Sequence, residues 1–339
     1  AHRRALEAEA MIDETRRLLA RLFGCQRPER IVFTMNATDA LNMAIKGILR
    51  PGAHAITSVL EHNSVSRPLN RLERDGVISL TRLPVGSEHV IDPDDVARAF
   101  TPSTRLVAVT QVSNVTGTIQ PVAAIGRIVR ERGAILLVDA AQSAGVVPID
   151  IESDAIDLLA FTGHKALLGP TGTGGLVVGE RAEIKPWREG GTGGDSSSPV
   201  QPAEFPHRLE GGTPNVFGIA GLREGARILL ERGVDTVLPH ERELIATFYH
   251  SLRDPVRYEW YGADRMITGR RGQGRVGLVG LNLPGFAPAE FAAVLDEQFD
   301  IAVRAGMHCA PYAHRHLGTF PEGTVRLSVG IHTTIEEMK

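Results

Sequence analysis

Apolar residues in the first part of the chain recur at the spacing of amphipathic helices. Between positions 4 and 23, leucine and alanine return every three or four residues, and Gly24 follows where a helix would end. Asn36 or Thr38 can cap the next helix, which we expect to run through Ile45. The same spacing predicts further helices between positions 59 and 76 and over 121–132, 218–232, 239–253 and 288–299.

Short apolar runs alternate with these helices and predict strands. The run from Ala134 to Val138 is wholly apolar and ends at Asp139, as expected of a strand that is buried on both faces of a sheet. Alternating strands and helices are typical of an α/β fold, in which helices cover a mainly parallel mixed sheet. The other strands are expected at 31–33, 54–58, 77–80, 106–110, 158–161 and 175–178.

The last third of the chain predicts a smaller α+β domain. The strands expected there are 276–283, 301–304 and 324–329. We therefore expect a large domain over residues 1–233 and a small C-terminal domain over 234–339, with the boundary near Gly233. The stretch 190–206 is rich in Gly, Ser and Pro and has no periodicity, so we expect a loop.

Composition and charge exclude several classes of protein. A hydrophobic content of 42% is too high for intrinsic disorder, and a net charge of -3 argues against a nucleic-acid-binding protein. No apolar stretch is long enough for a membrane-spanning helix, so we expect no membrane association. Two cysteines, Cys25 and Cys309, cannot form a disulfide framework and fit a reducing compartment such as the cytoplasm.

The two ends of the sequence predict a fragment. The chain begins at Ala1 with no Met, and it closes on Thr333 to Lys339, a segment typical of the first turn of a helix. We therefore expect a piece of a longer protein that has been cut at both ends.

Lys165 is the strongest candidate for chemistry. It follows an apolar strand, within Thr162-Gly163-His164-Lys165, and precedes a glycine-rich turn. A lysine partly removed from water at the end of a strand favours the neutral amine, which can form a Schiff base with an aldehyde. The alternative is an ordinary surface lysine on a turn.

Asp139 and Gln142 follow the predicted strand that is buried on both faces. Acidic residues at the carboxyl ends of parallel strands lie where ligands bind in open α/β sheets. The functional interpretation needs a cationic partner, such as the protonated pyridine nitrogen of pyridoxal 5'-phosphate (PLP). The alternative is that Asp139 caps a helix.

Two further segments follow predicted strands. Thr34 to Ala40 could bind phosphate through backbone N–H groups and the Thr38 hydroxyl, although it lacks the P-loop signature, and capping alone would also explain it. His62, in Glu61-His62-Asn63-Ser64, could stack on a flat ring or transfer protons, or it could be structural.

The segment around Cys309 combines a thiol with basic neighbours. Arg304 and His308 precede Cys309, and positive neighbours favour the nucleophilic thiolate. A buried inert cysteine is one alternative, and a metal site that also uses His314 and His316 is another, disfavoured because no paired-cysteine motif accompanies it.

Arg326 lies inside an apolar strand and so requires an anionic partner. A substrate carboxylate or a structural salt bridge would satisfy it equally well.

Two loops are also rich in groups that could bind a ligand. The segment Glu210 to Asn215 could present N–H groups to a phosphate or be a capped turn, and the basic segment Gly269 to Arg275 predicts a solvated turn.

The order and spacing of these motifs closely resemble the class V aminotransferase-like family of fold-type I PLP enzymes. Within it the chain resembles the cysteine desulfurase and selenocysteine lyase branch, in its desulfurase-like subgroup. The resemblance covers the whole chain. It is most specific at residues 61–63, 112–117, 138–142, 162–165, 211–215 and 304–309.

The resemblance implies a role for each candidate residue. Lys165 would carry PLP, Asp139 would pair with the pyridinium nitrogen, and His62 would stack on the ring and help proton transfer. Gln142 and Asn114 would bond the ring oxygen, while Thr38, Thr162 and His164 would hold the phosphate. Gly212 and Thr213 would reach the phosphate of a neighbouring subunit, which implies a homodimer. Arg326, with Arg304 and Asn114 nearby, would bind the substrate carboxylate.

The implied reaction converts L-cysteine to L-alanine. Cys309 would attack the substrate sulfur and become a persulfide, whose sulfur passes to an acceptor protein or thiol. Another reaction of the same fold remains open: selenocysteine lyase, another C–S lyase or an aminotransferase. The segment that usually opens this family is missing from the sequence, which also leaves open a PLP-binding scaffold without catalysis.

Overall fold

The computed structural model describes residues 2–193, 197–252, 254–262 and 274–339, and a seven-stranded sheet organises the first two thirds of them. The strand order is β1-β7-β6-β5-β4-β2-β3, and only β7 runs antiparallel to its neighbours. This mainly parallel mixed sheet confirms the predicted α/β class. The strands are β1 (Ile31–Thr34), β2 (Ala53–Ser58), β3 (Ile78–Leu83), β4 (Thr104–Thr110), β5 (Ile135–Asp139), β6 (Leu158–Thr162) and β7 (Gly174–Val178).

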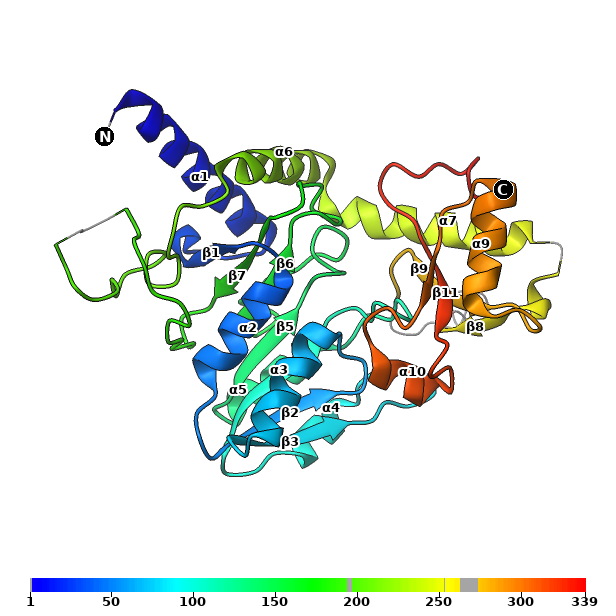
Figure 1. Ribbon diagram of the computed structural model, residues 1–339, viewed down its shortest axis with the longest axis horizontal. Helices are drawn as coiled ribbons and strands as arrows, with labels where there is room; N and C mark the ends of the chain where they lie inside the picture. Colours follow the sequence, from blue (N-terminus) through cyan, green and yellow to red (C-terminus); the bar gives the residue numbers. More distant parts are fainter. Residues whose placement is uncertain (1, 194–196, 253, 263–273) are drawn as a thin grey trace.

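Helices cover both faces of this sheet, as Figure 1 shows. Side chains that alternate along β5 enter two separate cores: Leu136 and Val138 face one, and Leu137 faces the other. The first core packs under α1 (Arg3–Leu22), α5 (Val122–Glu131) and α6 (Val216–Arg232). The second packs under α2 (Ala37–Ile48) and α3 (Asn63–Arg74). Burial on both faces explains why the strand sequences are almost continuously apolar.

Glu210, one of the candidate phosphate-loop residues, ties the first helix to the sheet instead. Both of its carboxylate oxygens accept from the Arg16 guanidinium, at 2.9 and 2.6 Å, and Oε1 also accepts from the Phe33 amide at 2.6 Å. Arg16 is buried and lies over the Phe33 ring at 4.5 Å. Because a buried guanidinium needs an anionic partner, this contact is structural.

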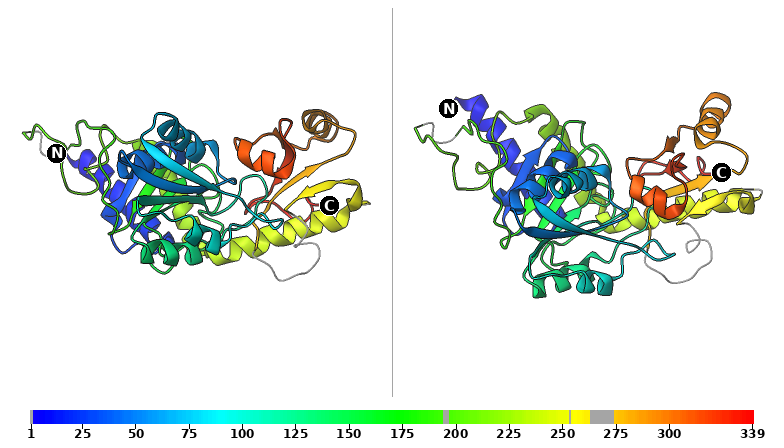
Figure 2. Two further views of the ribbon diagram at one scale, coloured as in Figure 1. Left: turned by 90° about the horizontal axis from the view of Figure 1, so that it is seen from below. Right: turned by 60° about the horizontal axis from the view of Figure 1, so that its bottom comes forward.

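The C-terminal part forms a four-stranded antiparallel sheet in the order β10-β11-β9-β8. Its strands are β8 (Glu259–Tyr261), β9 (Leu278–Asn282), β10 (Arg304–Gly306) and β11 (Thr324–Ser328), and its helices are α7 (Val237–Ser251), α9 (Pro288–Phe299) and α10 (Pro311–Leu317). Figure 2 shows α7 extending from the end of α6 along this sheet. The chain turns between the two helices at Gly233, whose φ is 85°. The domain boundary at Gly233 stays a prediction.

Several element boundaries differ from the predicted ones. The strand predicted at 301–304 begins only at Arg304, because Asp300 adopts a left-handed conformation and Ile301 and Ala302 remain exposed and unpaired in the sheet. Short elements that the sequence did not predict include α4 (Pro93–Arg98), β8 and α10. Residues 269–273 of the predicted basic turn lie outside the described residues, and Arg275 is buried rather than solvated. No helix that the structure describes is both long and apolar enough to cross a membrane.

Candidate active site

The carboxyl ends of β1, β2, β4, β5 and β6 lie at one edge of the large sheet. β2, β4, β5 and β6 are parallel, and β1 points the same way because both β1 and β6 run antiparallel to β7. A cavity of about 310 Å³, here called the Lys165 cavity, opens at this edge. Its lining includes most of the predicted site residues: Thr38, His62, Asn114, Asp139, Gln142, Thr162, His164, Lys165 and Arg304.

Lys165 projects into this cavity from the turn after β6. The turn needs a glycine at 163, because a Cβ there would overlap the Thr173 side chain. The Lys165 side chain is solvent-accessible. The surrounding protein nevertheless buries part of it, which lowers the pKa of the amine, and the negative charge of Asp139 opposes this effect. The amine is therefore biased toward the neutral form that attacks an aldehyde.

Asp139 ends β5 and has only 4% of its surface exposed. Its Oδ1 accepts from the Ala141 amide at 2.9 Å, in a turn rather than at the start of a helix. Among the described residues, no Lys, Arg or His forms a salt bridge with it. A buried carboxylate that lines a cavity in this way fits a cationic ligand atom, such as a protonated ring nitrogen.

The charge of Asp139 gives a testable pH effect. Replacing Asp139 by Asn removes the largest influence that raises the pKa of Lys165, so burial acts unopposed by that charge and the pKa falls further below its usual value. The rate at which the apo-protein captures PLP, measured against pH by absorbance, should then have its midpoint at lower pH than in the wild type. Asp296→Asn on exposed α9 is the matched control, and an unmoved or higher midpoint in Asp139→Asn contradicts the expectation.

A chain of hydrogen bonds connects Thr38 to His62. Thr38 Oγ1 lies 2.7 Å from Ser64 Oγ, which lies 2.9 Å from His62 Nδ1. That nitrogen also accepts the Ser64 amide at 3.1 Å, which leaves the ring proton on Nε2 in the neutral form. Burial lowers the pKa of His62, and the charge of Lys165 acts in the same direction, while the negative charge of Asp139 opposes them. His62 is therefore a neutral ring with a free N–H donor.

The start of α2 and the end of β6 form the polar wall of the cavity. Asn36 caps α2 by accepting the Asp39 amide at 3.0 Å, so Thr38 lies in the first turn of the helix, where its hydroxyl lines the cavity. Thr162 Oγ1 lies 3.0 Å from His164 Nδ1. Hydroxyls beside a helix N-terminus suit a phosphate.

Arg326 lies on β11, directly opposite Arg304 on β10. Its Nη1 donates to the Asn114 carbonyl at 3.0 Å, and its buried Nε makes no hydrogen bond within the described ranges. The structural salt bridge considered as an alternative is not present among the described residues. Arg326 lines a neighbouring cavity of about 370 Å³, which shares Gln142 and Lys165 with the Lys165 cavity. Two opposed guanidinium groups near the lysine fit an anionic ligand.

Cys309 is exposed in the short loop between β10 and α10. His308 and Cys309 both adopt left-handed backbone conformations, with φ of 45° and 59°. Three hydrogen bonds hold this conformation: Asn63 N to Cys309 O at 2.7 Å, Asn114 Nδ2 to His308 O at 2.6 Å, and Ala310 N to Met307 O at 2.8 Å. Cys309 lines a further cavity of about 530 Å³, here called the Cys309 cavity, which shares Arg304 with the Lys165 cavity.

The prediction that His308 is positively charged is wrong. Its ring is buried, Nε2 lies 3.0 Å from the Thr324 carbonyl, and burial together with the charge of Arg326 lowers the pKa of the ring to about 3. His308 is therefore neutral, and Arg304 supplies positive charge beside Cys309. The histidines considered as metal ligands have other contacts, since His314 Nδ1 lies 2.7 Å from Thr319 Oγ1 and His316 packs against His89.

Gly212 and Thr213 are the two predicted site residues that the structure does not bring to the cavities. Both are exposed in the loop before α6, where Gly212 N donates to Gly191 O at 2.8 Å. Their position leaves them free to contact another molecule.

Glu61, directly before His62, is a completely buried carboxyl to which the sequence pattern assigned no role. Ser58 Oγ donates to its Oε1 at 2.6 Å, and burial raises the pKa of this carboxyl to about 8, with the charge of Asp139 acting in the same direction. Glu61 is therefore protonated at neutral pH. Its place between a strand and His62 was visible in the sequence, but its complete burial was not.

Comparison with known proteins gives consistent results. The sequence model of the family described as aminotransferase class-V matches residues 1–339. A probable cysteine desulfurase of Methanothermobacter thermautotrophicus is 34% identical over 346 residues, which span 100% of this chain and 84% of that protein. The cysteine desulfurase IscS of Glaesserella parasuis is 33% identical over 351 residues, 100% of this chain and 81% of its own length.

Solved structures show the same relationship. The apo structure of a cysteine desulfurase from Thermococcus onnurineus superposes with a TM-score of 0.91 at 34% identity, over 100% of this chain and 83% of that chain. The cysteine desulfurase CsdA of Escherichia coli superposes with a TM-score of 0.88 at 28% identity, over 100% and 84% of the two chains.

Proposed function

The chain belongs to the aminotransferase class-V family, and on this basis we propose that it is a PLP-dependent cysteine desulfurase. The observation that carries the proposal is the arrangement of three groups. Lys165 and Asp139 line one cavity, and Arg304 connects that cavity to the exposed thiol of Cys309. Cleavage of a C–S bond needs an electron sink, a group that moves the α-proton and a soft nucleophile, and these residues provide or hold each of them.

The residues of the Lys165 cavity fit PLP by their chemistry. The amine of Lys165, which favours its neutral form, suits the aldehyde of PLP, and the buried Asp139 carboxylate suits the ring nitrogen of PLP. Thr38, Thr162 and His164, at the polar wall, suit its phosphate. Gln142 and Asn114 would bond the ring oxygen, and His62 would stack on the ring. When bound there, PLP supplies the electron sink for the substrate α-carbon.

Arginine residues orient the substrate L-cysteine. We assign its carboxylate to Arg326, with Arg304 and Asn114 beside it, because both guanidinium groups lack an acidic partner among the described residues. This places the α-carbon toward Lys165, which borders both the Lys165 cavity and the cavity lined by Arg326.

Lys165 and Cys309 perform the chemical steps that the chain itself contributes. Lys165 Nζ moves the proton at the α-carbon, with the neutral His62 Nε2–H as a neighbouring donor. The Cys309 thiolate then attacks the substrate sulfur, so that an S–S bond forms and the substrate Cβ–S bond breaks. Protonation of the carbon framework gives L-alanine, and Cys309 is left as a persulfide for an acceptor protein or thiol.

We further propose that the enzyme is a cytoplasmic homodimer. Exposure of Gly212 and Thr213, together with Phe217 at 92% exposed on the first turn of α6, supports a partner subunit at this surface. The two thiols are free, which suits a reducing compartment.

The test is product analysis with purified protein reconstituted with PLP. With L-cysteine and a reductant, a desulfurase yields L-alanine and sulfide in equal amounts. Pyruvate and ammonia with sulfide would identify a C–S lyase instead, and a keto acid formed without sulfide would identify an aminotransferase. Turnover of L-selenocysteine without turnover of L-cysteine would identify a selenocysteine lyase. A PLP absorption band without any product would identify a scaffold and overturn the proposal.

A further inference from the structure

Most residues of the Cys309 cavity have no role in the cleavage of L-cysteine described above, which uses only Arg304 and Cys309 from its lining. It lies between α3 and α10 and has a volume of about 530 Å³, which is in the range of small-molecule sites. We propose that it binds a low-molecular-weight thiol that carries a carboxylate, and that this thiol takes the sulfur from Cys309. The proposal rests on the proposed desulfurase function, since it names the acceptor for the same persulfide.

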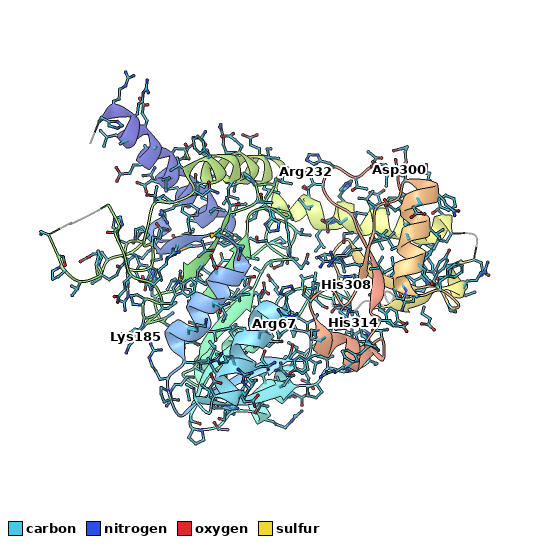
Figure 3. The ribbon with its side chains drawn as sticks, viewed as in Figure 1. Arg67, Lys185, Arg232, Asp300, His308 and His314 are labelled. Carbon is cyan, nitrogen blue, oxygen red and sulfur yellow. The ribbon has the colours of Figure 1, made fainter. Side chains whose placement is uncertain are left out.

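The charge of the cavity wall selects an anion. Arg67, Arg304 and Arg315 line it, and no Asp or Glu does within the described residues. None of these three guanidinium groups forms a salt bridge or hydrogen bond among the described residues. Figure 3 places Arg67, on α3, beside the part of the chain that carries His308 and His314. Guanidinium groups that line one cavity without an acidic partner bind carboxylates with charge-assisted hydrogen bonds.

Contacts around Tyr312, on α10, hold one part of the cavity wall in place. The Arg82 guanidinium lies 3.9 Å from the centre of its ring, and Arg315 lies 5.7 Å from it. Asn70 Nδ2 donates to the Tyr312 hydroxyl at 3.1 Å, while Arg82 donates to Asn70 Oδ1 at 2.7 Å. Arg315 also lies 4.7 Å from the Phe320 ring centre. The wall is therefore prepared for a ligand before it binds, which reduces the entropy lost on binding.

The loop that carries Cys309 is anchored by hydrogen bonds, so the acceptor must come to the thiol. The loop from Gly306 to Pro311 is short, and the hydrogen bonds from Asn63 and Asn114 fix both sides of Cys309. Such a loop cannot carry its sulfur far from the cavity. An acceptor small enough to enter a cavity of this volume meets this requirement.

The transfer step is balanced without any oxidant. The acceptor thiolate attacks the outer sulfur of the Cys309 persulfide, and a new S–S bond forms on the acceptor. The bond between Cys309 Sγ and the outer sulfur breaks, and its electron pair remains on Cys309 as the thiolate. The acceptor leaves as a persulfide, and the cavity arginines stabilise its carboxylate throughout.

The experiment separates sulfur loading from sulfur transfer. The PLP-loaded enzyme is treated with L-cysteine, desalted, and checked by intact-mass spectrometry for the Cys309 persulfide. It is then mixed with 3-mercaptopropionate or with the neutral 3-mercaptopropionamide, and loss of the persulfide is followed in time, with rates expressed per thiolate. We expect 3-mercaptopropionate to react faster, and Arg67→Gln or Arg315→Gln to reduce this preference by about tenfold, as loss of a hydrogen bond to a charged group would.

The controls distinguish a failure of the proposed acceptor site from a failure of the proposed desulfurase function. Arg127→Gln, an equal charge change at an exposed position of α5 that lines neither cavity, should keep the preference of the wild type. Equal rates for the two thiols, or a preference that survives both arginine variants, overturn the inference. If no persulfide forms, the desulfurase proposal fails instead. Calorimetry with 3-(methylthio)propionate, which cannot accept sulfur, then still tests the site: binding weakened by Arg67→Gln supports it, and absence of binding overturns it.

Discussion

Replacing Lys165 by Ala is expected to reduce alanine formation from L-cysteine by about 10³-fold or more, because one residue both carries the cofactor and moves the α-proton. The structure places this amine in the Lys165 cavity, where burial lowers its pKa. No other lysine lines that cavity among the described residues, so no neighbouring amine can replace it. The measurement is alanine release together with the absorption spectrum of the PLP-reconstituted protein.

A second lysine provides the matched control. Lys185 is exposed and lines none of the three cavities near the site, and Figure 3 shows it at the far side of the large sheet from His308. Lys185→Ala should keep both the spectrum and the activity of the wild type. Lys165→Ala should lose the band that depends on the lysine but still bind PLP through Asp139 and the phosphate wall. If Lys165→Ala retained wild-type turnover, another base would have to act, and the assignment would be wrong.

The sequence predicted the large sheet well because strands that are buried on both faces have almost continuously apolar sequences. The run ending at Asp139 is apolar at every position before it, and the structure buries all but its first strand residue. The small sheet was harder to predict because its elements are short and their limits depend on contacts distant in sequence. β10 begins at Arg304 because it pairs with Arg326, a contact that no local pattern reveals.

The site residues were predicted by their position after strands, and this explains both the successes and the failures. His62, Asp139 and Lys165 each follow a strand end, and parallel strands bring these ends to one edge. The neutrality of His308 could not be predicted, because it depends on burial of the ring in the fold and on the charge of Arg326. For the same reason the sequence did not reveal the protonated Glu61 carboxyl.

Replacing Cys309 by Ala is expected to remove persulfide formation and to reduce alanine formation by about 10²-fold or more, because the substrate sulfur then lacks its nucleophile. PLP binding should survive, since Cys309 lines a cavity separate from that of Lys165. The measurement is alanine, sulfide and intact mass after treatment with L-cysteine. Loss of activity with an unchanged PLP spectrum places the effect at sulfur transfer rather than at cofactor binding.

The other cysteine is the natural control for this result. Cys25 has 9% of its surface exposed, its Sγ lies 3.3 Å from the Arg27 carbonyl, and burial raises the pKa of its thiol. These features disfavour a nucleophile, so Cys25→Ala should still load sulfur on Cys309 and form alanine. Alanine and sulfide formation that persists in Cys309→Ala would contradict the mechanism, and pyruvate in their place would identify a C–S lyase. Because the two thiols differ in exposure and in surrounding charge, the pair of variants tests whether the exposed position of Cys309 gives it its role.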